Sequence, residues 1–181
     1  MLKLYRHIGD SIEYVECWIN DGVGVKHAGV VGDRGEITNT PNTTDLKAYE
    51  NALREEYAPQ GYTEWPKSLH YWIVAQIPVE TIEKGRPLIQ PMLDALNNDL
   101  GWIGLGHMDG YDIGWSFRPE GKELVLNFFA EVVEKDIGCA TVRQTIINKS
   151  EQEHYDIGYR PFDEDEYTMY ESTKGRKDFW P

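Results

Sequence analysis

Three side chains that could hold a metal ion lie close together in the middle of the chain. His107, Asp109 and Asp112 follow one another among several glycines. Hard cations bind several carboxylate oxygens, and transition metals bind converging histidines or cysteines. In a strand His107 and Asp109 would share a face, but Asp112 lies beyond Gly110. An Asp-Gly pair is typical of a tight turn in which the aspartate bonds nearby amides, so we favour a turn over a metal site.

Other catalytic signatures are incomplete. Residues 101–106 (Gly-Trp-Ile-Gly-Leu-Gly) have the glycine spacing of a dinucleotide loop, but a strand-like segment follows them where that fingerprint requires a helix. No serine occupies a G-x-S-x-G turn. With 31 acidic residues in the chain, paired carboxylates are expected by chance and do not indicate acid–base catalysis. We therefore expect a non-catalytic protein without a cofactor.

The cysteines and histidines favour structural roles. Cys17 and Cys139 are far apart, lie in apolar contexts and form no CxxC pair, so we expect two buried free thiols. Four histidines each lie near a strand: His7, His27, His70 and His154. We expect each to be either a structural side chain with its hydrogen bonds satisfied or an exposed one.

Composition indicates which partners are excluded. A chain of 181 residues with 40% hydrophobic and 27% charged residues should fold. Its net charge of −13 repels phosphate backbones and attracts basic proteins. No apolar leader opens the chain and no apolar run is long enough to span a bilayer, so we expect a cytoplasmic protein without nucleic-acid or membrane partners.

The elements that must position these residues fall into two units that meet at Pro66. In residues 1–66, strands are expected at 1–6, 11–19, 23–31 and 36–39. Thr43-Thr-Asp45 then offers a helix N-cap, and apolar residues follow it at helical spacing: Leu46, Tyr49, Leu53 and Tyr57.

This order resembles the WGR domain, a small sheet followed by one helix and a Gly-Tyr…Trp tail. The likeness rests on residues 3–5, 27–35, 52–57 and 61–65. The eponymous Trp-Gly-Arg is replaced here by Ala28, Gly29 and Val30. In family members that bind nucleic acid, the Trp and Arg help to form the contact surface. The resemblance therefore implies the fold and argues against DNA binding.

The second unit, residues 67–162, reads as strand, helix, hairpin, helix and strand. Strands are expected at 69–78, 100–115, 124–133 and 154–162, with Arg118–Gly121 joining the hairpin. Helices are expected from about Arg86 or Pro87 and over 137–148. This is the ferredoxin-like split βαβ pattern, in which two helices cover one face of an antiparallel sheet. Residues 163–181 follow as an acidic C-terminal tail. The whole is an α+β protein.

The segment Gly106–Gly114 resembles a signature of small, uncharacterised bacterial proteins of ferredoxin-like shape, several of which look like immunity proteins or toxin partners. With the acidity of the chain, this favours a protein that inhibits a basic toxin or enzyme through an acidic, aromatic-rich surface. The expected contact residues in the glycine-rich segment are Trp102, His107, Asp109, Tyr111, Asp112 and Trp115. The expected contact residues in the tail are Asp163, Glu164, Asp165 and Glu166.

Two alternatives stay open at this point. An enzyme or small-ligand-binding protein would have a deep cleft between the two units, lined by converging polar groups. A WGR-type nucleic-acid module would shift the mobility of DNA in a salt-dependent way.

Overall fold

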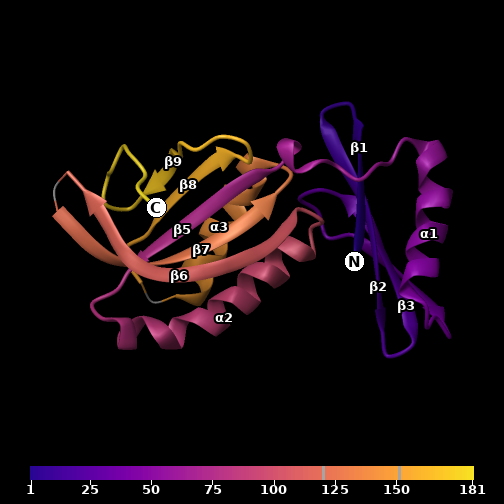
Figure 1. Ribbon diagram of the computed structural model, residues 1–181, viewed down its shortest axis with the longest axis horizontal. Coiled ribbons are helices and arrows are strands. Elements are labelled where there is room, and N and C mark those ends of the chain that lie inside the picture. The colour runs from indigo at the N-terminus through magenta and orange to yellow at the C-terminus, as the bar shows by residue number, and fades with distance from the viewer. Residues whose placement is uncertain (120, 151) are drawn as a thin grey trace. The chain divides into compact units, whose positions relative to one another are not determined.

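The structure is a computed structural model that describes residues 1–119, 121–150 and 152–181 (Figure 1). These residues form an α+β protein with two antiparallel sheets, three α-helices and two short 3₁₀-helices. The chain divides into two compact units. The first contains Met1–Pro66 with Trp102–Gly104, and the second contains Lys67–Gly101 with Leu105–Pro181.

The first unit contains a four-stranded sheet in the order β1-β2-β3-β4. Its strands are β1 Leu2–Ile8, β2 Ser11–Asn20, β3 Val23–Val30 and β4 Glu36–Pro41. The predicted strands are confirmed here within a few residues at each end. The Asn-Asp-Gly turn joins β2 to β3, with Asp21 and Gly22 at positive φ as a tight hairpin turn requires.

One helix, α1 Leu46–Tyr57, packs on this sheet. Its predicted N-terminus is confirmed, because the Asp45 side chain accepts a hydrogen bond from the Ala48 amide at 3.0 Å. Leu53 enters a buried cluster with residues of β1 and β2. The 3₁₀-helix η1 Ala58–Gln60 follows α1, and η2 Lys67–Leu69 opens the second unit.

The second unit contains a five-stranded sheet in the order β6-β7-β5-β8-β9. Its strands are β5 Tyr71–Pro78, β6 Gly106–Arg118, β7 Gly121–Val132, β8 Asp156–Pro161 and β9 Thr168–Ser172. Helices α2 Ile82–Gly101 and α3 Lys135–Lys149 cover one face. Gly138 of α3 lies against Ile73 and Gly85 of α2 lies near Ile113, and the register places both isoleucines on that face.

Two predicted boundaries in this unit were wrong. Helix α2 begins at Ile82 and includes both Pro87 and Pro91. The prolines are exposed and one turn apart, so water can reach the carbonyls whose helical hydrogen bonds are lost. The helix also continues to Gly101, and the strand expected from Leu100 begins only at Gly106. The hairpin turn predicted at 118–121 includes residue 120, which lies outside the described residues.

Residues 163–181, predicted as an acidic tail, contribute structure to the second unit. Strand β9 pairs with β8. Phe179 is 6% exposed and lies against Gly158, where an added Cβ would come within 2.4 Å of the ring. Within the described ranges, no helix combines the length and apolar character needed to cross a membrane.

Candidate functional site

The candidate site is strand β6, which forms one edge of the five-stranded sheet (Figure 1). It is the longest strand among the described residues. Three aromatic side chains on it remain exposed: Tyr111 at 48%, Trp115 at 52% and Phe117 at 71%. Even spacing places all three on one face of the strand. Large exposed rings gathered on one element are typical of interaction surfaces.

The neighbouring strand explains why this face is apolar. Tyr111 lies opposite Phe128, and Trp115 lies opposite Leu124. Ile113, between them on the same face, reaches Gly85 of α2. Trp115 and Phe117 lie farther along the strand and stay exposed. Lys122 lies over the Trp115 ring at 4.5 Å, a cation–π contact.

The opposite face of β6 is polar. Asp112 accepts a hydrogen bond from Asn127 Nδ2 at 2.6 Å. The register continues this rung across all five strands, through Asp112, Asn127, Gln76, Asp156 and Ser172. A polar row of this length fixes the relative register of the strands, because sliding any strand by one residue would move its polar group into the apolar core.

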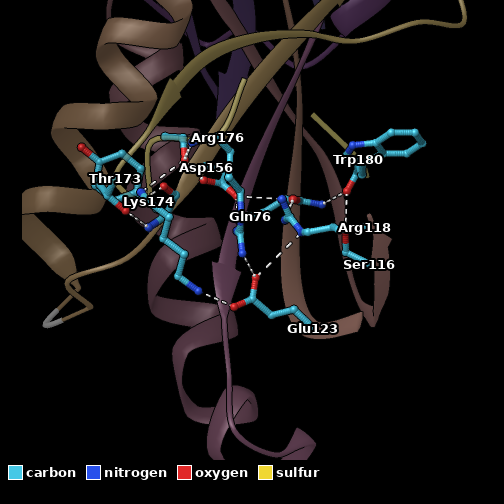
Figure 2. Close-up of polar contacts among 11 residues, drawn as sticks. Gln76, Ser116, Arg118, Glu123, Asp156, Thr173, Lys174, Arg176 and Trp180 are labelled. Atoms are coloured by element: carbon cyan, nitrogen blue, oxygen red, sulfur yellow. Dashed lines mark hydrogen bonds and ion pairs between the residues drawn. The ribbon is translucent and has the colours of Figure 1, made fainter. Parts of the chain in front are cut away.

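Figure 2 shows the charged side chains near this row, of which Arg118 and Asp156 are buried. Arg118 donates to Gln76 Oε1 at 2.7 Å and pairs with Asp156 at 3.1 Å. Arg176 also pairs with Asp156, at 2.7 Å, and with Glu123 at 3.0 Å. Burial acts to raise the pKa of Glu123, but Lys174 and Arg176 outweigh burial and lower it below its usual value.

The C-terminal segment completes this face. The main-chain carbonyl of Trp180 accepts hydrogen bonds from Gln76 Nε2 at 2.8 Å and from Ser116 Oγ at 2.7 Å (Figure 2). Ser116 is buried, while Trp180 is 45% exposed. The segment thus links the end of β6 to the central strand β5.

A second buried acid lies at the other end of β7. Glu131 contacts His70 Nδ1 at 2.6 Å and Lys67 Nζ at 3.1 Å. Burial acts to raise the pKa of Glu131, but these two partners lower it overall. Gly106 faces the same residue, and a Cβ there would come within 2.0 Å of the Glu131 carbonyl oxygen. Close packing therefore accounts for this glycine.

Trp102 belongs to the first unit, whereas Tyr111 and Trp115 belong to the second. Its ring packs edge-on against His27 at 5.3 Å, and Arg34 lies over it at 5.0 Å. Trp102 lies between helix α2 and strand β6, and its part in the contact surface stays a prediction.

His27 is the centre of a buried chain of hydrogen bonds. Its Nδ1 lies 2.8 Å from Glu16, which Lys3 neutralises at 2.8 Å, and its Nε2 lies 2.9 Å from the Tyr14 hydroxyl. Burial raises the pKa of Tyr14 to about 12, so this hydroxyl keeps its proton. Each of the four side chains on this path contacts a polar partner, which is the pattern of a structural histidine.

Of the other expected residues, His107 and Asp109 are exposed near the start of β6, and Asp109 lies at a bulge. The acids at 163–166 are also exposed, but their loop joins β8 to β9 at the far edge of the sheet from β6. Arg160 holds that loop by donating to the carbonyls of Phe162 and Glu164. The acidic residues of the expected surface therefore form two separate groups.

Sequence reasoning missed Phe117, the most exposed of the three β6 rings. Residues 111, 113, 115 and 117 are apolar at every second position, and this period-two pattern would have predicted Phe117 as part of the same face.

Among the described residues, no group of three or more His, Cys, Asp or Glu side chains is arranged to hold a metal ion.

The first unit also has an open hollow of about 490 Å³. Ala28, Gly29 and Val30, the positions at which the WGR family carries Trp-Gly-Arg, lie in its lining. Tyr57 and Tyr62 line it as well.

Comparisons of the chain with known protein families, with curated proteins and with solved structures find no match.

Proposed function

We propose that this chain is a non-catalytic protein-binding protein that inhibits a basic toxin or enzyme, as an immunity protein does, and that β6 carries the contact. The observation that supports this is the set of exposed rings at positions 111, 115 and 117 on a sheet edge. Aromatic side chains dominate the binding energy of many interfaces, because each buries a large area at low entropic cost.

The rigidity of the strand adds to this argument. Lys122 lies over the Trp115 ring, and Ser116 donates a hydrogen bond to the Trp180 carbonyl. A preformed surface loses little conformational entropy on binding, so more of the contact energy contributes to affinity.

The charge of the molecule supports a basic partner. Net charge is −13, and both Asp109 and Asp112 are exposed on β6. The exposed acids at 163–166 add a second acidic site on the other side of the same unit. A field of this sign accelerates encounter with a cationic protein and slows encounter with nucleic acid.

We also propose that the two units are WGR-like and ferredoxin-like. The order β1-β2-β3-β4 followed by one helix supports the first assignment. The order β6-β7-β5-β8, with α2 and α3 on one face, supports the second, and β9 is then an addition to its edge. With Ala28 and Val30 in place of Trp and Arg, the first unit lacks the side chains that would contact nucleic acid.

Site-specific photocrosslinking in the native cell tests the proposed function. The crosslinkable residue benzoylphenylalanine is placed at position 117 in one variant and at position 147 in another. Ile147 is a matched control, because it is 47% exposed but lies on α3. We expect one discrete protein adduct from position 117 and none from position 147.

The adduct from position 117 should disappear when Trp115→Ala is added, and the partner should have a basic isoelectric point. Equal adducts from both positions, or none from position 117, would contradict the assignment of β6. Turnover of a small molecule by the purified chain would contradict the non-catalytic part of the proposal.

A further inference from the structure

The edges of the two sheets are protected unequally. Strand β1 is bridged by Thr63 through Tyr5, and β9 is bridged by Asp178 through Thr168. Strand β4 is short, polar and ends at Pro41. Short length, proline and an added bridge are devices by which proteins prevent unwanted strand pairing.

Strand β6 has little of this protection beyond its first residues. Near its start, Asn97 caps the Met108 amide and a bulge follows at Asp109. From Gly110 to Phe117 the strand contains neither lysine nor proline, and in the described part of the chain it pairs only with β7. Its one charged residue in this stretch is Asp112, and a long edge that lacks lysine and proline leaves main-chain donors and acceptors available to a further strand.

We infer that the partner adds an extended strand to the free edge of β6 and that this strand alternates apolar and basic residues. The two faces of β6 dictate that alternation. An incoming residue on one face meets the rings of Tyr111, Trp115 and Phe117. An incoming residue on the other face meets Asp112 and the open space above Gly114. Cross-strand neighbours on one face interact directly, so apolar and cationic side chains are selected in turn.

Charge also excludes a second copy of this chain as the added strand. Pairing two β6 edges would bring together strands whose only formal charges between residues 106 and 117 are negative, on molecules of net charge −13. The occupant is therefore a strand of a basic partner.

This inference rests on the proposed function and is tested separately from it with synthetic peptides. The probe is a capped eight-residue peptide of alternating valine and lysine, titrated into the full ¹⁵N-labelled chain at low salt. A peptide with the same composition in two blocks, four lysines followed by four valines, controls for charge attraction alone. We expect the alternating peptide to shift the amides of residues 110–118 and to bind more tightly than the block peptide.

Gly114 provides the matched variants. Its φ is not in the left-handed region and a Cβ there meets nothing within 4 Å, so both Gly114→Lys and Gly114→Ala should fold. Gly114→Lys places a cation beside Asp112 and should weaken binding of the alternating peptide by about two- to fivefold relative to Gly114→Ala.

Equal binding of the two peptides, equal binding by the two variants, or shifts confined to other strands would overturn strand addition. The proposed function would survive that result if crosslinking from position 117 still identified one basic partner. It would fail independently if position 117 gave no adduct.

Discussion

Single carboxylates decide how the second unit responds to acid. Glu131 is buried and Glu123 is partly buried, and both have pKa values below the ordinary glutamate value because basic side chains contact them. A depressed pKa means that the folded state binds the proton less readily than the unfolded chain does. Each glutamate's contribution to folding stability is therefore complete above its pKa in the unfolded chain, and it is lost as the pH falls through its pKa in the folded protein.

Glu131→Gln should therefore destabilise the protein at pH 7 and matter less as the pH falls below 4. We expect a loss of more than about 1 kcal/mol at neutral pH, because His70 and Lys67 lose an ionised partner. Urea unfolding at several pH values measures this, with the exposed Glu153→Gln as control. A constant difference between wild type and Glu131→Gln across the pH range would contradict it.

The two thiols should be inert in the folded protein. Burial raises the pKa of Cys17 to about 11 and that of Cys139 to about 12, so almost no thiolate exists at pH 8. Iodoacetamide followed by mass spectrometry should detect no modification of the native chain and two modifications after denaturation. Rapid labelling of the native chain would show that the described packing around either cysteine is wrong.

At the scale of elements, local periodicity predicted most strands and helix α1. Alternating residues in 11–19 and the Asp45 cap needed no tertiary information. The start of α2 was missed, because Pro87 and Pro91 favour a later start and only their exposure makes them tolerable. Strand β9 was missed because its residues follow an acidic stretch and its pairing depends on β8, which sequence spacing does not reveal.

The C-terminal segment should stabilise the second unit. Phe179→Ala removes a buried ring beside Gly158 and should cost about 3–5 kcal/mol of unfolding free energy. Trp180→Ala is the control, because its ring is 45% exposed and its carbonyl bonds to Gln76 and Ser116 are main-chain bonds. Chemical denaturation should find only a small loss for Trp180→Ala. Equal losses for the two variants would show that Phe179 is not a core residue.

At the scale of the whole molecule, net charge and exposed rings should control different rate constants. The charge of −13 acts during encounter, so added salt should lower the association rate for a basic partner. Trp115→Ala with Phe117→Ala removes two exposed rings and should raise the dissociation rate by about tenfold or more. Surface plasmon resonance with the partner that crosslinking identifies measures both the association rate and the dissociation rate. An unchanged dissociation rate would exclude these rings as anchors.

The candidate surface could be predicted only in part. Tyr111, Asp112 and Trp115 were predicted from the glycine-rich segment and do lie on one strand. Trp102 was included because it is close in sequence, but it belongs to the other unit. The acids at 163–166 were included for their charge, yet they lie at the opposite edge of the sheet. Sequence proximity and charge identify candidates, whereas the strand order decides which of them share a surface.

Amide hydrogen exchange on the free chain and on its complex with the partner that crosslinking identifies tests the central claim most directly. If the partner binds the β6 edge, amides within 110–118 should gain protection, and those of β4, the exposed edge strand of the first unit, should not. Protection gained elsewhere, with residues 110–118 exchanging as fast in the complex as in the free chain, would contradict the claim that β6 binds the partner.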